Sequence, residues 1–136
     1  MKRILIVDDE PSILLSLSHI LSSDDTVVIT CSRIEEAEEA LDRYKFDLAI
    51  ADIRLSGIYG IEGLELLSYI RRISPDTKVI IMTAYGSDEV RESAYMRGAY
   101  HYYEKPIDMD DFVEKVENLG IKAALNKTRG GKRCQP

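Results

Sequence analysis

Tryptophan is absent from this 136-residue sequence, and cysteine, histidine and proline are scarce, with two, two and four residues respectively. The cysteines, Cys31 and Cys134, fit a reducing cytoplasm better than a disulfide framework. The histidines, His19 and His101, lack the spacing of metal ligands and are interpreted as ordinary helix and strand residues. The sequence therefore argues against a disulfide-rich secreted domain and gives no sign of a zinc site.

Long apolar segments are missing as well. Behind Lys2 and Arg3 the apolar run covers only residues 4–7 before Asp8 interrupts it. Such a run is too short for a signal peptide or a membrane span. We therefore expect a cytoplasmic protein with no membrane partner.

The net charge of −6 is distributed unevenly. Residues 126–136 contain four basic residues and no acid, which leaves −10 on residues 1–125. Because the body of the chain repels phosphates, we expect no direct nucleic-acid binding by this domain. The basic segment contains Gly130 and Gly131, and we interpret residues 121–136 as a linker or terminal tail.

Residues 1–120 are long enough for one domain with its own core. Their apolar residues switch repeatedly between the strand period and the helix period. The predicted strands are Lys2–Val7, Thr26–Thr30, Phe46–Ala51, Val79–Met82 and Tyr100–Tyr103. A helical pattern follows each strand. Pro11 suits the first turn of the first helix, Ser32 and Glu35 predict a capping box for the second, and Asp108 can cap the fifth.

Five strands that each precede a helix predict a mostly parallel sheet, because the crossovers between them must be right-handed. The fold class is therefore a doubly wound α/β fold with five strands and five flanking helices. In such sheets ligands bind beyond the carboxyl ends of the strands.

Polar residues follow four of the five predicted strands. The first strand leads into Asp8, Asp9 and Glu10, the third into Asp52, the fourth into Thr83, and the fifth leads to Lys105. Carboxylates that meet at one edge repel each other unless a cation lies among them. Mg²⁺ suits this set of oxygen ligands better than Zn²⁺.

A carboxylate, a magnesium ion, a hydroxyl and a lysine together predict a phosphoryl-transfer site. Asp52 is the best candidate for the nucleophile, because it stands alone at the end of the central apolar strand. Thr83 can donate a hydrogen bond to a phosphoryl oxygen, and Lys105 can contact the group as a point charge.

At this point the sequence resembles the receiver domain of two-component response regulators over about residues 2–120. Five segments carry the resemblance: residues 4–10 (ILIVDDE), 52–54 (DIR), 79–84 (VIIMTA), 98–99 (GA) and 105–106 (KP). It implies a flavodoxin-like fold with strand order 2-1-3-4-5. It also implies phosphorelay signalling, with a sensor histidine kinase as partner and no catalysis beyond phosphotransfer and dephosphorylation on the chain itself.

The resemblance also implies residue roles. Asp52 is the phosphoacceptor, Asp9 binds Mg²⁺ directly, Asp8 assists through water, and the Arg54 backbone carbonyl supplies another ligand. Thr83 and Lys105 contact the phosphoryl group. Thr83 and Tyr102 form the switch, and the Lys105–Pro106 peptide bond is cis.

Three features depart from the family pattern or modify it. The acceptor is usually followed by proline at the fourth position and glycine at the eighth, whereas here Ser56 is fourth and Gly63 is eleventh. This spacing implies an insertion of roughly three residues near Gly57–Ile61. Arg54 and Tyr85 occupy the positions that flank the attacking water, so we expect the phosphate to persist for minutes or longer. His101 stands where the family often has aspartate.

The resemblance places the output surface on the fourth helix, fifth strand and fifth helix. There we expect pairing with a second receiver or an output domain, through residues that include Tyr95, Tyr100, Lys105, Asp108 and Asp111. Residues 79–87 resemble receivers of enhancer-binding transcription activators, so we expect an output domain missing from this sequence that acts on transcription.

Three alternatives remain open at this stage. A degenerate receiver would bind partners without phosphorylation, and the altered segment after Asp52 favours it. A flavin carrier needs a phosphate-binding loop after the first strand, where the run from Asp8 to Glu10 would repel phosphate. An aspartyl phosphatase needs its nucleophile after the first strand and a substrate cap, for which no segment is long enough.

Overall fold

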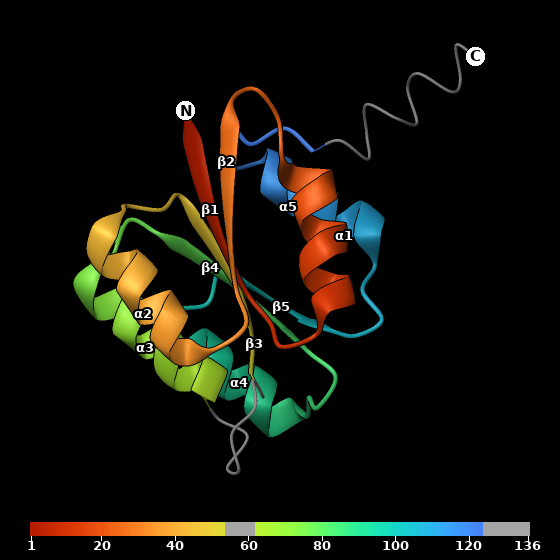
Figure 1. Ribbon diagram of the computed structural model, residues 1–136. Helices are drawn as coiled ribbons and strands as arrows, with labels where there is room; N and C mark the ends of the chain where they lie inside the picture. The colour runs from red at the N-terminus through yellow and green to blue at the C-terminus, as the bar shows by residue number, and fades with distance from the viewer. Residues whose placement is uncertain (54–61, 124–136) are drawn as a thin grey trace.

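The computed structural model describes residues 1–53 and 62–123. Strands and helices alternate along the chain without exception in this part (Figure 1). Their bounds are β1 Lys2–Val7, α1 Pro11–Leu21, β2 Thr26–Cys31, α2 Ile34–Arg43, β3 Leu48–Asp52, α3 Glu62–Ile73, β4 Lys78–Thr83, α4 Asp88–Met96, β5 His101–Glu104 and α5 Met109–Glu117.

The five strands form one parallel sheet, as the sequence pattern predicts, and their order β2-β1-β3-β4-β5 is the one that the family resemblance implies. Helices α1 and α5 cover one face, and α2, α3 and α4 cover the other (Figure 1). The central strands are thus buried on both sides, which explains why their sequences are continuously apolar rather than alternating.

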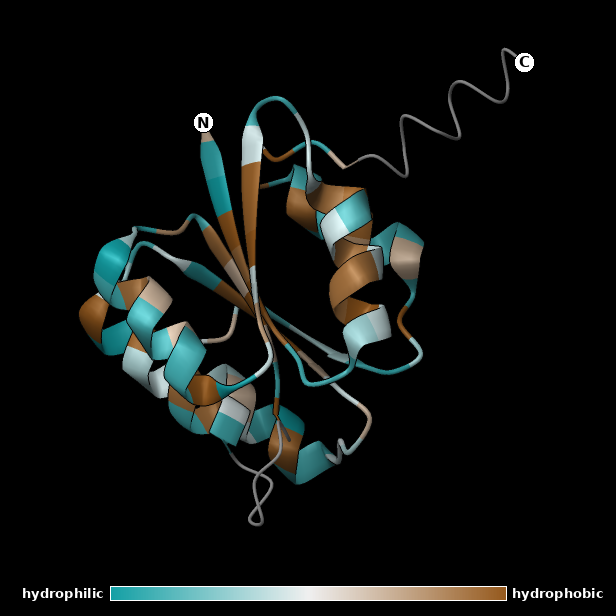
Figure 2. Ribbon diagram, in the orientation of Figure 1, coloured by the Kyte–Doolittle hydropathy of each residue, from teal (hydrophilic) through white to brown (hydrophobic). Residues whose placement is uncertain are grey.

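Each face of the sheet has its own core, and the side-chain alternation of the strands divides residues between them. In β1, Ile4 and Ile6 pack beneath α1 and α5, whereas Leu5 and Val7 pack beneath α2 and α3. To the core beneath α2, α3 and α4, strand β3 contributes only the small side chains of Ala49 and Ala51. Figure 2 shows the apolar residues concentrated in the strands and on the inner sides of the helices.

Two predicted helix starts are confirmed. Pro11 occupies the first turn of α1, and Asp108 accepts a hydrogen bond from Asp111 N–H as the N-cap of α5. Ser87 caps α4 in the same way, accepting from Val90 N–H. These side chains satisfy backbone donors that the helix itself leaves unpaired.

The predicted capping box of Ser32 and Glu35 is wrong. Helix α2 begins at Ile34 with Arg33 as its N-cap, so Ser32 lies one residue before the cap. Its backbone N–H and its hydroxyl instead donate to Glu36 Oε1, at 2.8 and 3.2 Å. The reciprocal partner is therefore one residue later than the motif predicts.

The ends of the elements also differ slightly from the predictions. Strand β3 begins at Leu48 rather than Phe46, whose carbonyl accepts a hydrogen bond from the Thr77 hydroxyl at 2.7 Å. At the other end, the buried side chains of Ile121 and Ala123 belong to the core beneath α1 and α5, so packed chain extends beyond residue 120. Within residues 1–53 and 62–123, every helix is too short or too polar to cross a membrane.

Phe112 tests the core between the sheet and α5. Its side chain is fully buried, and its ring meets the Tyr103 ring edge-on, with centroids 6.0 Å apart. We expect Phe112→Ala to lower the free energy of unfolding by about 3–5 kcal/mol, because it leaves a cavity. Urea unfolding measures the change. Leu15→Ala is the control, since Leu15 is 74% exposed, and it should change stability by less than about 0.5 kcal/mol.

Candidate functional site

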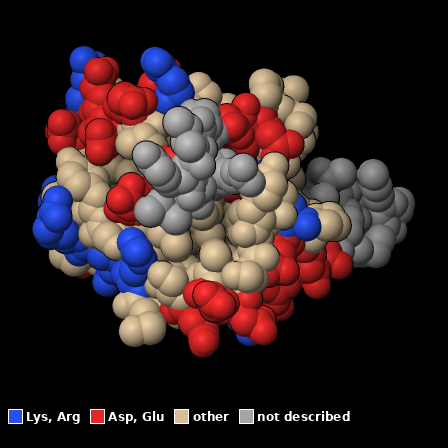
Figure 3. Space-filling model, turned by 90° about the horizontal axis from the view of Figure 1, so that it is seen from below, with Lys and Arg blue, Asp and Glu red and all other residues tan. Residues whose placement is uncertain are grey.

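The predicted polar residues meet at the carboxyl end of the sheet. Asp52 is the last residue of β3, Asp8 directly follows β1, Thr83 ends β4 and Lys105 directly follows β5. These four strands are neighbours in the sheet, so residues from distant parts of the chain lie together. Figure 3 views the molecule from this end, where acidic side chains gather in several groups around the rim.

Lys105 is the centre of the cluster. Its Nζ lies 2.9 Å from Asp8 Oδ2, 2.9 Å from Glu10 Oε1 and 3.2 Å from Asp52 Oδ2. An ammonium group has three N–H donors, so each carboxylate receives one of them. The side chain of Lys105 is only 11% exposed, and those of Asp8 and Asp52 are 3% and 4% exposed. Buried charges of this kind are tolerated because they are paired.

The pKa of Lys105 reflects this pairing. Burial by itself would lower it, since the charged form loses water. Hydrogen bonds to Glu10 and Asp8 and the charge of Asp52 outweigh burial and raise the pKa above the ordinary lysine value. The ammonium therefore stays charged throughout the neutral range.

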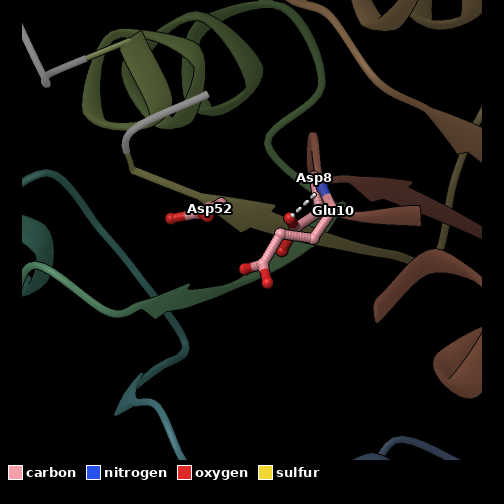
Figure 4. A group of neighbouring side chains, drawn as sticks. All are labelled: Asp8, Glu10 and Asp52. Atoms are coloured by element: carbon pink, nitrogen blue, oxygen red, sulfur yellow. Dashed lines mark hydrogen bonds between the residues drawn. The ribbon is translucent and has the colours of Figure 1, made fainter. Parts of the chain in front are cut away.

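Asp8, Glu10 and Asp52 could also hold a metal ion. One carboxylate oxygen from each lies within 4.8 Å of the others. Figure 4 shows these side chains side by side, with the Glu10 backbone N–H donating to Asp8 Oδ1 at 2.9 Å. An all-oxygen set of carboxylates fits Mg²⁺, which prefers oxygen ligands and keeps some of its waters.

Two of the predicted metal ligands are not part of this group. Asp9 is exposed, and its direct metal contact stays a prediction. Arg54, predicted to offer its carbonyl and to limit water access, lies outside the described residues, as does Ser56. The segment of the predicted insertion, Gly57–Ile61, also lies outside them.

Thr83 lies at the edge of the site with a fully buried side chain. Its hydroxyl oxygen accepts a hydrogen bond from the Tyr85 backbone N–H at 2.9 Å, and its carbonyl accepts one from the Lys105 N–H at 2.8 Å. The second bond joins the ends of β4 and β5 and places Lys105 beside Thr83. The Lys105–Pro106 peptide bond is cis, at the place where the resemblance implies one.

The predicted switch residue Tyr102 is buried beneath the segment between β4 and α4. Its hydroxyl donates to Glu104 Oε2 at 3.1 Å, and a Cβ added to Gly86 would collide with it. Burial, followed by the hydrogen bond to Glu104, raises the pKa of Tyr102 to about 12. Its backbone N–H donates to the Tyr95 hydroxyl, which ties β5 to α4.

Beside Tyr102, polar and aromatic groups connect β5 with α5. The Tyr103 hydroxyl donates to Asp111 Oδ2 at 2.7 Å, and Lys115 Nζ donates to Asp111 Oδ1 at 3.1 Å. His101 Nε2 lies 3.6 Å from Asp111 Oδ2, and its ring is 4.6 Å from the Tyr103 ring. Burial and the charge of Lys115 lower the pKa of His101, which favours neutral imidazole.

Gly63 fixes the backbone on the far side of Asp52. Its N–H donates to the Ile53 carbonyl at 2.8 Å, and a Cβ at this position would overlap the Asp52 backbone carbonyl. A larger residue therefore cannot occupy the position without moving the backbone of Asp52. This geometry agrees with the interpretation of Gly63 as the glycine that follows the acceptor in the family.

Sequence reasoning missed the contact between Glu10 and Lys105. Glu10 directly follows the aspartate pair, but a glutamate at the start of a helix is also an ordinary helix-favouring residue. Only the folded sheet brings it to a lysine 95 positions away. The bond between Tyr102 and Glu104 was missed as well, although residues two apart on a strand share one face.

The fold and this site define a class of proteins. Residues 4–117 match the family described as the response regulator receiver domain, which covers most of the chain. The chain therefore belongs to this family and is a receiver domain of the kind used in phosphorelay signalling.

Its curated relatives are regulators of transcription. It is 38% identical over 112 residues to the DNA-binding transcriptional regulator NtrC of Escherichia coli (strain K12), covering 82% of this chain and 23% of that protein. It is 32% identical over 116 residues to the transcriptional regulatory protein GlrR of the same strain, covering 85% and 26%. The chain thus spans about a quarter of the length of these relatives.

Solved receiver structures superpose on this one. The CheY-like receiver domain protein from Methanospirillum hungatei JF-1 matches with a TM-score of 0.79 at 36% identity, covering 88% of this chain and 94% of that one. The beryllofluoride-activated NtrC4 receiver domain dimer matches at 0.76 and 34%, covering 88% and 96%. TrrA from Thermotoga maritima, solved with Mg²⁺ and beryllofluoride, matches at 0.73 and 37%, covering 88% and 99%.

Gly63→Ala tests the contact between α3 and Asp52. Alanine normally stabilises a helix relative to glycine by about 0.5–1 kcal/mol. Here we expect the opposite sign, a loss of about 1–3 kcal/mol in the free energy of unfolding, because the added methyl group overlaps backbone. Chemical denaturation measures it. Glu65→Ala, at an exposed position in the same helix, should leave stability nearly unchanged, and a stabilised Gly63→Ala variant would contradict the geometry.

Proposed function

We propose that Asp52 accepts a phosphoryl group from a sensor histidine kinase and that the phosphorylated domain controls transcription through an output domain. The observation that carries this proposal is the buried triad of Asp52, Asp8 and Lys105 at the carboxyl end of the sheet. It combines a nucleophile, Asp52, with a positive charge on Lys105 and a second carboxylate, Asp8, that can help to hold Mg²⁺. Both cations can neutralise the charge of an incoming phosphate.

The reaction is a substitution at phosphorus. An Asp52 carboxylate oxygen attacks, the new oxygen–phosphorus bond forms, and the bond from phosphorus to the imidazole nitrogen of the kinase phosphohistidine breaks. The histidine keeps that electron pair and takes up a proton. The product is an acyl phosphate on Asp52.

The surrounding residues stabilise the transferred group. Lys105 already lies 3.2 Å from Asp52 Oδ2 and can move to a phosphoryl oxygen. Thr83 can turn its hydroxyl proton toward the same group, since in this structure its oxygen accepts the Tyr85 N–H. Mg²⁺, held by Asp8 and Asp52 with Asp9 and the Arg54 carbonyl, would neutralise charge as the phosphate transfers.

We further propose that the chain catalyses only the transfer to Asp52 and the later hydrolysis there, acting in the cytoplasm. Tyr85, predicted to hinder the attacking water, is exposed, and its backbone N–H donates to the Thr83 hydroxyl oxygen. That Tyr85 and Arg54 slow the hydrolysis of the Asp52 phosphate stays a prediction.

The output surface that we propose is the face of α4, β5 and α5. The NtrC4 receiver, a similar structure, is described as a dimer when activated by beryllofluoride. In this chain Tyr95 of α4 is exposed, and Lys115 donates to Asp111 on α5. Aromatic side chains are enriched at protein interfaces, and the dimer of the similar NtrC4 receiver favours a second copy of the domain as the partner.

Phosphate uptake tests the acceptor. Incubated with acetyl phosphate and Mg²⁺, the wild-type chain should gain one phosphoryl group by intact mass, and Asp52→Ala should gain none. A chelator should abolish the uptake. Asp24→Asn, which removes an exposed carboxylate just before β2, should behave as wild type. A folded wild-type chain that takes up no phosphate would instead favour the degenerate, phosphorylation-independent receiver.

Sedimentation tests the output surface. With Mg²⁺ and beryllofluoride we expect the mass to rise from monomer toward dimer, and Asp52→Ala should remain monomeric. Glu38→Lys, at an exposed position of α2, which packs on β1 and β2 at the sheet edge opposite β5, should still dimerise. An unchanged mass together with unchanged amide spectra around Tyr102 would exclude the proposed coupling.

A further inference from the structure

Glu10 is the third partner of Lys105. Its carboxylate lies near Asp8 and Asp52 in the group that could hold a cation, but Glu10 is neither the proposed acceptor nor one of the metal ligands that the family resemblance implies. Its Oε1 lies as close to Lys105 Nζ as Asp8 Oδ2 does, at 2.9 Å. The exposure differs, since the Glu10 side chain is 53% exposed. Lys105 is therefore held between two buried carboxylates inside the site and one at its mouth.

The backbone of Glu10 is fixed on both sides. Its N–H donates to Asp8 Oδ1 at 2.9 Å, and its carbonyl accepts the N–H groups of Ile13 and Leu14 at the start of α1. The carboxylate thus extends from an ordered turn. This lowers the entropy cost of keeping it on Lys105, a cost that weakens most surface ion pairs.

A cation bound by the two buried carboxylates would compete with Lys105 for them. Asp8 Oδ2 and Asp52 Oδ2 both accept a hydrogen bond from the ammonium in this structure, and both residues belong, together with Glu10, to the group that could hold a cation. Glu10 is the exposed member of this group and is not among the metal ligands proposed above, so its carboxylate can stay on Lys105 when Asp8 and Asp52 turn to a cation.

We propose that Glu10 is a positioning residue that holds the Lys105 ammonium at the mouth of the site, within reach of the phosphoryl group that arrives on Asp52. This inference rests on the proposed function of Asp52. If Glu10 positions Lys105, its carboxylate speeds the uptake of phosphate. A carboxylate that acted only through its charge would slow the uptake, because it would repel an anionic phosphate donor.

Two substitutions at Glu10 separate these effects. Glu10→Gln removes the charge, and Glu10→Asp keeps the charge but withdraws it by one methylene group. With acetyl phosphate, and with Mg²⁺ titrated to saturation for each variant, we expect both variants to take up phosphate about threefold to tenfold more slowly than wild type. Faster uptake by Glu10→Gln with normal uptake by Glu10→Asp would show repulsion alone and overturn the proposal.

A double-mutant comparison tests whether Glu10 acts through Lys105. In a Lys105→Met background, Glu10→Gln should cause no further slowing. A full additional loss there would overturn the proposal, because Glu10 would then act independently of the lysine.

Urea unfolding without metal or phosphate gives a second, independent measurement. Glu10→Gln should lower the unfolding midpoint in the wild-type background and leave it unchanged beside Lys105→Met. Equal shifts of the unfolding midpoint in both backgrounds would show that Glu10 and Lys105 do not stabilise each other, and would overturn the proposal. If the wild-type chain takes up no phosphate, the function proposed for Asp52 fails, whereas the unfolding comparison still decides whether Glu10 and Lys105 are coupled.

Discussion

The ammonium of Lys105 lies between two carboxylates that are almost entirely removed from water, and the geometry of the site depends on this contact. Without a cation, the buried carboxylates of Asp8 and Asp52 would leave uncompensated negative charge at the ends of adjacent strands, which costs several kcal/mol per charge. With the ammonium of Lys105 in place, both charges are compensated. The strand order of the sheet brings these groups together. Strands β1 and β3, which lead to Asp8 and Asp52, are neighbours, and β5, which leads to Lys105, lies beside β4 at the edge of the sheet.

The same edge connects the site to the outer face of the domain through short contacts. The Thr83 carbonyl holds the backbone of Lys105, while the Thr83 hydroxyl holds the start of the segment that leads to α4. That segment continues to Gly86, which lies against the Tyr102 hydroxyl with no room for a side chain. Any movement of Thr83 toward a phosphate must therefore be accommodated by the segment that packs on Tyr102.

Helix α4 is suited to respond, because little apolar surface holds it in place. Ala94 is its one fully buried side chain, and Val90 packs against the core while partly buried. Hydrogen bonds add to these contacts, namely the one from Tyr102 N–H to the Tyr95 hydroxyl and those of Arg97, which directly follows the helix. Arg97 Nη1 donates to the Leu64 carbonyl and the Ser68 hydroxyl of α3, at 3.1 and 3.2 Å. Polar contacts of this kind exchange more readily than a packed core, so elements that move tend to be held by them.

The sequence predicted the fold class and the meeting of Asp8, Asp52, Thr83 and Lys105, because both depend on local patterns combined with strong rules for parallel sheets. The strand order was implied by the resemblance to the receiver family. Contacts that depend on where a helix begins to within one residue, or on the reach of a long side chain, were not predicted. Glu36 rather than Glu35 binds Ser32 since the helix begins one residue later than the motif suggests. The reach of Lys105 to Glu10 depends on how two strand ends lie in space, which no local pattern encodes.

The spacing between the acceptor and the following glycine departs from the family pattern, yet the backbone contact between them is kept. Gly63 lies eleven rather than eight residues after Asp52, and its N–H donates to the Ile53 carbonyl while a Cβ at this position would overlap the Asp52 backbone. Lengthening the connection from about six to about nine residues costs only about 0.4 kcal/mol in closure entropy. Three additional residues therefore weaken the fold very little, because the helix that follows still packs directly on the backbone of Asp52.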